Sequence, residues 1–116
     1  MGYYTTYSMT VRNVKDKEQF DELCMLLNAY GILRYALDSG SMYENTAEFC
    51  SYNEVKWYEH EEDMMDISKE LPDMVFQLRG YGEDPEDIWE KYFKCGDCEE
   101  CIAQIIIPKP ERIKWD

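Results

Sequence analysis

The sequence predicts an α+β protein, a ferredoxin-like sandwich in which two main helices cover one face of a mostly antiparallel sheet of four to six strands. Segments that alternate apolar and polar residues, as strands do, are interleaved with two segments whose apolar residues recur every three or four positions, as in amphipathic helices. The chain has 116 residues, of which 45% are hydrophobic and 15% aromatic, which suits one packed domain. We expect this domain to span residues 1–107 and a tail to follow at 108–116.

The first half of the chain predicts a strand, a helix and further β structure. Residues 3–11 alternate as a strand, with the odd-numbered side chains on the face that packs on the core. A helix begins after Asp16, because Asp16 and Gln19 have the spacing of a capping box. Its buried stripe is predicted to comprise Phe20, Leu23, Leu27 and Tyr30. Residues 47–58 indicate one bent strand, or a hairpin that turns near residues 51–53.

The second half predicts a helix and three strands. The helix covers residues 61–71, and its buried side chains are Met64, Ile67 and Leu71. The strands cover residues 74–80, 88–94 and 102–107. The last strand is apolar on both faces, so we expect a central or covered position for it. In the middle strand, alternation leaves open whether the pair Ile88 and Tyr92 or the pair Trp89 and Phe93 faces outward.

The charge of the chain excludes whole classes of partner. Twenty-five Asp and Glu stand against 12 Lys and Arg, a formal net charge of −13. Direct binding to nucleic acid or to an anionic membrane is excluded, because both require many Lys and Arg. No segment has the pattern of a signal peptide or of a membrane helix. The odd count of five cysteines favours a reducing compartment, so we expect a cytoplasmic location.

The acidic residues are concentrated in the second half, where residues 59–107 hold 15 Asp and Glu but four Lys and Arg. Such a field steers a protein towards basic surfaces, and carboxylates spaced like phosphates can occupy a basic cleft by mimicry. The alternative is an acidic face that only keeps the protein in solution. The candidate partner-binding residues are Glu59, Glu61, Glu62, Asp63, Asp66, Glu83, Asp84, Glu86, Asp87 and Glu90, with Tyr58, Tyr81 and Trp89 as aromatic anchors.

Residues 56–93 carry a resemblance to known proteins. Its features are Trp57-Tyr58, His60, the acidic helix, Pro72-Asp73, Phe76, Leu78, Gly80, Gly82-Glu83 and Asp87-Ile88-Trp89. With these features the segment resembles small acidic proteins encoded by phages and mobile elements of Gram-positive bacteria, some of them similar to the YubB ferredoxin-like group. The resemblance implies a fold and a mobile-element setting in a bacterial host cell, and it transfers no catalytic or binding residues.

Charge and resemblance together predict a non-enzymatic interaction protein without a cofactor. We expect a phage or mobile-element inhibitor of the anti-CRISPR type, which blocks a basic nucleic-acid-binding surface of a host defence protein. An immunity protein or antitoxin that binds a basic nuclease is an alternative with the same charge requirement. The sequence is compatible with a monomer and with a homodimer.

A cysteine cluster carries a different hypothesis, a small zinc-binding module. Three cysteines have C-x-x-C-x-x-C spacing, at Cys95, Cys98 and Cys101. A fourth ligand would have to come from Cys50, Cys24 or His60. The simpler interpretation is a hairpin tip that carries free thiols, with the acids at 97, 99 and 100 opposing thiolate formation by like-charge repulsion.

His60 is the one histidine of the chain, with Glu59, Glu61 and Glu62 around it. These carboxylates favour its protonated form. A catalytic base needs a nucleophile and an orienting group, and no neighbouring sequence supplies them. We therefore expect an exposed histidine at the N-terminus of the second helix.

Overall fold

The computed structural model describes residues 5–33, 36–38, 40–51, 54–82 and 88–102. They form an α+β fold with a six-stranded antiparallel open sheet and two helices. In chain order the elements are β1 (Thr6–Arg12), α1 (Lys17–Ala29), β2 (Ser41–Tyr43), β3 (Thr46–Cys50), α2 (His60–Glu70), β4 (Val75–Tyr81), β5 (Ile88–Lys94) and β6 (Asp97–Ile102). The predicted strand residues 103–107, the tail 108–116 and the acidic residues 83–87 lie outside the described residues.

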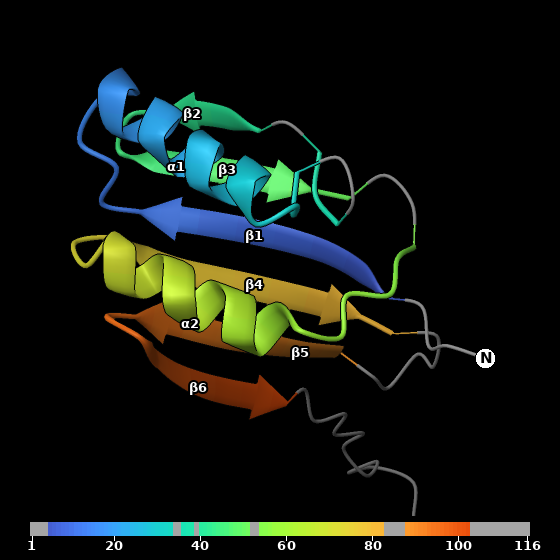
Figure 1. The fold of residues 1–116 in the computed structure, drawn as a ribbon. Coiled ribbons are helices and arrows are strands. Elements are labelled where there is room, and N and C mark those ends of the chain that lie inside the picture. The colour runs from blue at the N-terminus through green and yellow to red at the C-terminus, as the bar shows by residue number, and fades with distance from the viewer. Residues whose placement is uncertain (1–4, 34–35, 39, 52–53, 83–87, 103–116) are drawn as a thin grey trace, which may run out of the picture.

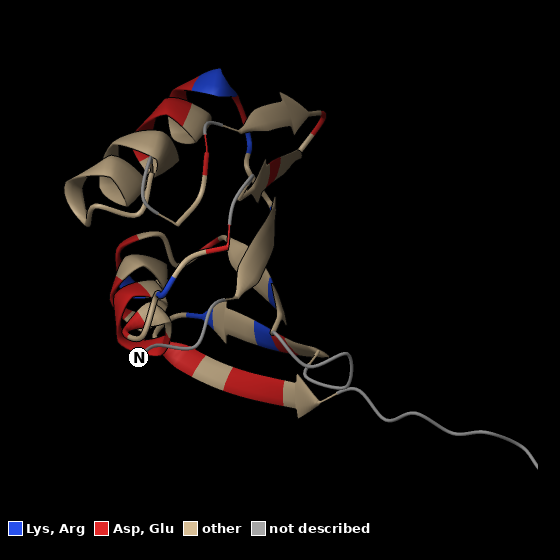
Figure 2. Ribbon diagram, turned by 90° about the vertical axis from the view of Figure 1, so that its right-hand side faces the viewer, with Lys and Arg blue, Asp and Glu red and all other residues tan. Residues whose placement is uncertain are grey.

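The strands lie in the order β2-β3-β1-β4-β5-β6, and every neighbouring pair is antiparallel. Both helices lie on the same side of the sheet, α1 over the β1–β3 half and α2 over the β4–β5 half (Figure 1). The view along the sheet in Figure 2 shows the same two layers. In the described part of the chain, no helix or strand covers the other face. We call the covered face the inner face and the uncovered one the outer face.

The capping box predicted for α1 is confirmed. The Asp16 carboxylate accepts a hydrogen bond from the Gln19 backbone N–H at 2.9 Å, and the Gln19 side chain accepts one from the Lys15 N–H. Leu23 and Leu27 are fully buried, as predicted. Tyr30 is instead exposed, because the helix ends at Ala29 and the side chain of the capping residue leaves the buried stripe.

The first half contains a hairpin that the sequence did not predict, ahead of the segment expected to bend or turn near residues 51–53. Its turn lies at Glu44 and Asn45, where Glu44 has a positive φ of 55°, and it joins β2 to β3. β3 ends at Cys50, and Ser51 then forms a side-chain hydrogen bond with the Tyr7 N–H at 2.8 Å. Beyond Ser51 the chain pairs with β1 once more, where Thr5 and Val55 exchange backbone hydrogen bonds of 2.9 and 3.0 Å. Residues 52 and 53, near which the bend or turn is predicted, lie outside the described residues.

The core lies between the inner face and the two helices, and its largest fully buried side chains come from all the layers. They include Met9, Val11, Leu23, Leu27, Met64, Ile67, Phe76, Leu78 and Phe93. β5 has the predicted bounds, and the structure settles its orientation: Trp89, Lys91 and Phe93 face inward. Gly80 of β4 pairs with Trp89, and a Cβ at Gly80 would overlap the indole ring. The missing side chain therefore makes room for Trp89 on the sheet.

The last described strand begins five residues before the strand predicted there. Cys95 and Gly96 both have positive φ, 53° and 85°, as in a two-residue hairpin turn. The turn pairs Lys94 with Asp97, so β6 starts at once and contains Cys98 and the acids at 97, 99 and 100, which we expected at the hairpin tip. Within the described sheet β6 is an edge strand with exposed acids. The central or covered position predicted for residues 102–107 falls almost entirely outside the described residues.

Neither described helix is long and apolar enough to cross a membrane.

Candidate functional site

A buried lysine lies between α2 and the sheet, at the centre of a polar cluster. The side chain of Lys91 is 8% exposed, and its Nζ lies 2.6 Å from His60 Nε2. The same atom is 3.3 Å from a Glu61 carboxylate oxygen and 3.8 Å from one of Glu100. It also lies 4.5 Å from the centre of the Trp89 ring, within reach of a cation–π interaction. Lys91 therefore connects α2, β5 and β6. We call Lys91, His60, Glu61, Trp89 and Glu100 the inner cluster.

His60 is half-buried in this cluster and not exposed as predicted. Its ring stacks on Trp89, with centroids 4.9 Å apart, and its Nδ1 lies 2.8 Å from the Trp57 carbonyl oxygen. Because a carbonyl can only accept, Nδ1 carries the proton and Nε2 accepts from Lys91. Burial, with a smaller contribution from Lys91, lowers the pKa of His60, although the Trp57 carbonyl and the carboxylates act in the other direction. The flanking glutamates do not decide its charge, because desolvation is the larger effect.

Three hydrogen bonds made by Trp57 hold the start of α2 on the sheet. The Trp57 carbonyl accepts a hydrogen bond from the Tyr7 hydroxyl at 3.3 Å and another from His60 Nδ1. The buried Trp57 indole N–H donates to the Asp63 carboxylate at 2.9 Å. Asp63, predicted as a partner-binding residue, is therefore half-buried and holds the helix start in place.

The exposed acids of two distant segments gather at one edge of the molecule. The acidic surface, as we define it, comprises Glu59, Glu61, Glu62 and Asp66 around α2 and Asp97, Glu99 and Glu100 on β6, all exposed. Figure 2 shows these two acidic elements next to each other. The pairing of β6 with β5 places the second group there, and Lys91 lies beneath both. The sequence had separated the two groups by about thirty residues.

The remaining predicted anchors and acids are distributed differently. Tyr58 is exposed, at 67%, and Tyr81 is exposed on the outer face, at 39%. Trp89 faces inward and is partly buried, with its ring stacked on His60. Glu90 points to the outer face, where it pairs with Arg79. Glu83, Asp84, Glu86 and Asp87 lie outside the described residues.

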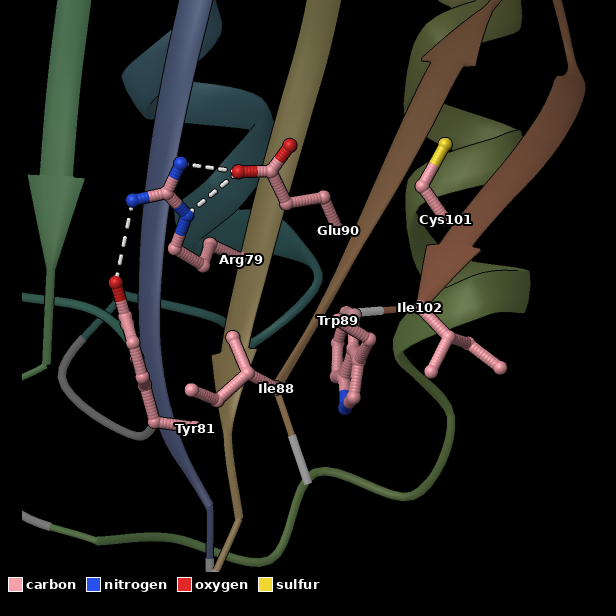
Figure 3. A pocket seen from close by; sticks show the side chains of 7 residues that line it. All are labelled: Arg79, Tyr81, Ile88, Trp89, Glu90, Cys101 and Ile102. Carbon is pink, nitrogen blue, oxygen red and sulfur yellow. Dashed lines mark hydrogen bonds and ion pairs between the residues drawn. The ribbon is translucent and has the colours of Figure 1, made fainter. Parts of the chain in front are cut away.

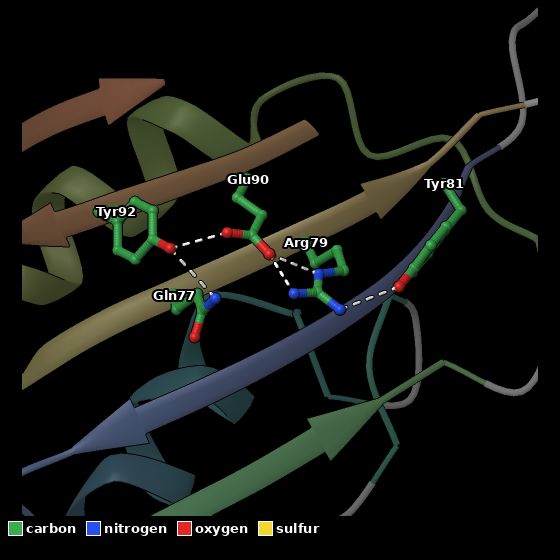
Figure 4. A network of polar contacts seen from close by, with 5 residues as sticks. All are labelled: Gln77, Arg79, Tyr81, Glu90 and Tyr92. Carbon is green, nitrogen blue, oxygen red and sulfur yellow. Dashed lines mark hydrogen bonds and ion pairs between the residues drawn. The ribbon is translucent and has the colours of Figure 1, made fainter. Parts of the chain in front are cut away.

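The outer face of β4 and β5 carries a second polar group, the outer cluster (Figure 4). The Arg79 guanidinium donates to Glu90 through Nε at 2.7 Å and through a second nitrogen, and to the Tyr81 hydroxyl at 3.2 Å. The Tyr92 hydroxyl donates a hydrogen bond to Glu90 at 2.7 Å and accepts one from the Gln77 side-chain amide at 3.2 Å. The hydrogen bond from Tyr92, together with Arg79, lowers the pKa of Glu90, and the same bond raises that of Tyr92.

Beside the outer cluster lies a shallow hollow of about 350 Å³ (Figure 3). Arg79 and Glu90 form one side of it, and Tyr81 and Ile88 form another. The cation and the anion that line it, Arg79 and Glu90, are paired with each other, so the hollow presents mainly apolar surface.

The cysteine cluster does not converge on one point. Cys98 pairs with Phe93 on the inner face and Cys101 with Glu90 on the outer face, since three residues along a strand reverse the side. Cys95 lies in the turn, where its thiol donates to the Pro72 carbonyl at 3.3 Å. Burial, and then Glu61, raises the pKa of Cys98. Among the described residues no three His, Cys, Asp or Glu are placed to hold a metal ion, so the zinc hypothesis loses its basis there.

Sequence reasoning missed Lys91. The signal was present in Trp89-Glu90-Lys91-Tyr92-Phe93, where a lysine shares a face with Trp89 and Phe93. It pointed to a buried cation only once that face was known to be the inner one.

Comparison of the chain with known protein families, with curated proteins and with solved structures finds no match.

Proposed function

We propose that this chain is a non-enzymatic interaction protein of a phage or mobile element, and that its acidic surface blocks a basic nucleic-acid-binding surface of a host defence protein. The observation that carries the proposal is the gathering of acids from α2 and β6 at one edge. Glu59 to Asp66 and Asp97 to Glu100 become one surface through the pairing of β5 with β6.

Charge of this kind acts at a distance and is screened by salt. A surface of one sign raises the encounter rate with a surface of opposite sign and disfavours partners of like sign. The seven carboxylates extend over a helix and a strand, so they can meet several Arg and Lys of a groove that normally holds phosphates. Tyr58, exposed near the start of α2, supplies an aromatic contact next to these charges.

The topology supports a ferredoxin-like origin of the fold. The first six elements follow the order β-α-β-β-α-β, and their strands lie as β2-β3-β1-β4, all antiparallel. The hairpin of β5 and β6 extends this arrangement beyond β4. In the proposed function this added hairpin supplies three of the seven residues of the acidic surface and the lysine beneath it.

The inner cluster supports a structural role for its reactive groups. Lys91 is almost fully buried, and it contacts an imidazole, two carboxylates and an indole ring. An amine that acts on a substrate must reach it, whereas these contacts occupy Lys91 inside the protein.

The first test is affinity capture of the tagged protein from host lysate at low and at high salt, with identification by mass spectrometry. We expect one basic nucleic-acid-binding protein at low salt and its loss at high salt. Recovery of a basic toxic nuclease instead would assign the surface to an immunity protein. A blank at both salt concentrations contradicts the proposal.

Charge reversal then locates the surface. The variant E62K/D66K/E99K reverses three exposed acids of the acidic surface and spares Glu61, Asp63 and Glu100, which have partners inside the protein. The control E18K/D21K/E22K makes the same change in net charge on α1, where all three residues are also exposed. We expect the first variant to lose affinity for the captured partner on the order of 10- to 100-fold, and the control to lose far less. Equal losses would show that net charge, and not this surface, governs binding.

A further inference from the structure

The inner cluster joins the two halves of the acidic surface through one cation. Glu61 belongs to α2 and Glu100 to β6, and both carboxylates lie within 4 Å of Lys91 Nζ. Their side chains are 54% and 48% exposed, so each reaches from the surface down to the buried amine. Without that amine, two acids would face each other across the junction of α2 with the sheet.

His60 makes this arrangement dependent on its own charge. Its Nε2 accepts from the Lys91 ammonium at 2.6 Å, and an imidazolium in that place would set a second cation against the first. The ring is also the first residue of α2, where the helix dipole disfavours positive charge. Its other nitrogen already donates to the Trp57 carbonyl, so the ring cannot turn to offer a proton elsewhere without losing that bond.

The groups that face His60 act in both directions. Lys91 from β5 opposes its protonation, and Glu61 from α2 and Glu100 from β6 favour it. Tyr7 from β1 contributes an aromatic ring 5.9 Å away, and Cys98 of β6 lies beyond Glu61. Both carboxylates are half-exposed and therefore screened by water, whereas the amine is buried and adjacent. The balance favours the neutral ring in the closed structure.

We propose that Lys91 is a positioning residue that fastens α2 to β6 through Glu61 and Glu100, and that protonation of His60 releases the first turn of α2 from the sheet. The closed state has a neutral His60 and holds Glu61 beside Glu100. In the open state the imidazolium is in water, and the hydrogen bonds to the Trp57 carbonyl and from the Trp57 indole are broken. An effect of this release of α2 on partner binding rests on the proposed function, whereas the release itself does not.

Hydrogen exchange tests the release without any partner. Amides from Asp63 to Ile67 in α2 are compared with those from Leu23 to Leu27 in α1, at pH 7.5 and pH 5.5, after correction for intrinsic exchange rates. Since the exposed ring has an ordinary pKa near 6.5, we expect the opening constant of α2 to rise by up to about tenfold more than that of α1.

Two variants make the test specific. H60Q keeps a neutral acceptor for Lys91 but does not titrate, so the difference between the helices should no longer depend on pH. K91M should open α2 already at pH 7.5 and weaken the pH response, while K17M on exposed α1 should do neither. Equal pH responses of wild type and H60Q, or equal loosening of both helices, would overturn the proposal. H60Q decides alone if K91M does not fold, and a failed capture experiment leaves this result unaffected.

Discussion

Glu90 and Lys91 are neighbours in the chain, yet they belong to two polar clusters on opposite faces of the same sheet. Lys91 faces inward, with its side chain 8% exposed, and contacts an imidazole, two carboxylates and an indole ring. Glu90 faces outward, 24% exposed, and pairs with an Arg79 that is itself 43% exposed. Both clusters contain a cation, carboxylate and aromatic groups, so their difference lies in burial.

Burial changes what the same chemistry does. In the outer cluster water solvates any group that loses its partner, so each contact adds little and the groups keep their usual charges. In the inner cluster an unpaired group stays desolvated, so each partner matters, and the charge of His60 becomes dependent on its surroundings. We expect the inner cluster to control the structure and the outer one to be replaceable.

The largest expected effect comes from the residue that makes room for the inner cluster. In Gly80→Ala the new Cβ would overlap the Trp89 indole, which in turn carries His60. We expect a loss of about 2–3 kcal/mol in the free energy of unfolding, measured by urea denaturation. The same substitution in a Trp89→Ala background should cost much less, because the clash is gone. Equal costs in both backgrounds would show that Gly80 is needed for its backbone alone.

The next comparison removes one cation from each cluster. Lys91→Ala deletes the buried methylene chain of the lysine and leaves His60 Nε2 without its donor, so we expect a cost of about 2 kcal/mol. Arg79→Ala should cost about 0–1 kcal/mol, because Glu90 keeps its bond from Tyr92 and gains water. Both values come from urea denaturation at pH 7.5. An Arg79 variant as unstable as the Lys91 variant would contradict the contrast between the faces.

Acid should affect the two clusters in different pH windows. The native pKa of His60 lies below its ordinary value of 6.5, so the unfolded chain takes up this proton first and stability falls as the pH drops below about 6.5. The native pKa of Glu90 is also lowered, from 4.5, so its contribution is present above pH 4.5 and is lost at lower pH. In thermal unfolding, the slope of Tm against pH should therefore differ between H60Q and wild type from pH 7 to pH 5.5. The slope of Tm against pH for E90Q should differ from that of wild type only below about pH 4.5.

The smallest expected effect is a single hydroxyl of the outer cluster. Tyr92→Phe removes a hydrogen bond that lowers the pKa of Glu90, so we expect this pKa to rise towards 4.5 in an NMR titration. The free energy of unfolding should change by less than about 0.5 kcal/mol, because the site is open to water. Tyr81→Phe is the matched control, since its hydroxyl contacts Arg79 and not Glu90. A larger shift for Tyr81→Phe would contradict this assignment.

Local patterns sufficed for most of the secondary structure. Side-chain chemistry within a few residues predicted the cap at Asp16, the buried Leu23 and Leu27 of α1, the buried Met64 and Ile67 of α2, and the bounds of β5. All of these are confirmed. The start of β6 could not be predicted in this way. Asp and Glu have little strand preference, and the turn at Cys95 and Gly96 sets that strand by its geometry.

The candidate site was only half predictable. The acids of α2 were recognised from composition, whereas Asp63 and Trp89 were assigned to the surface and lie in the packing beneath it. Exposure of His60 was also a wrong expectation. Neighbours in sequence predict the local charge, but burial depends on residues such as Lys91, thirty-one positions away.

The sequence by itself determined the charge, the two amphipathic helices and the alternating strands, because these depend on residues close together in the chain. Only the tertiary structure decided which face of β5 is buried, since both Ile88 with Tyr92 and Trp89 with Phe93 are apolar enough for a core. Pairing with β4 sets Trp89 over Gly80, and this register turns Lys91 inward beneath α2. The same register, continued into β6, brings Glu100 beside Glu61.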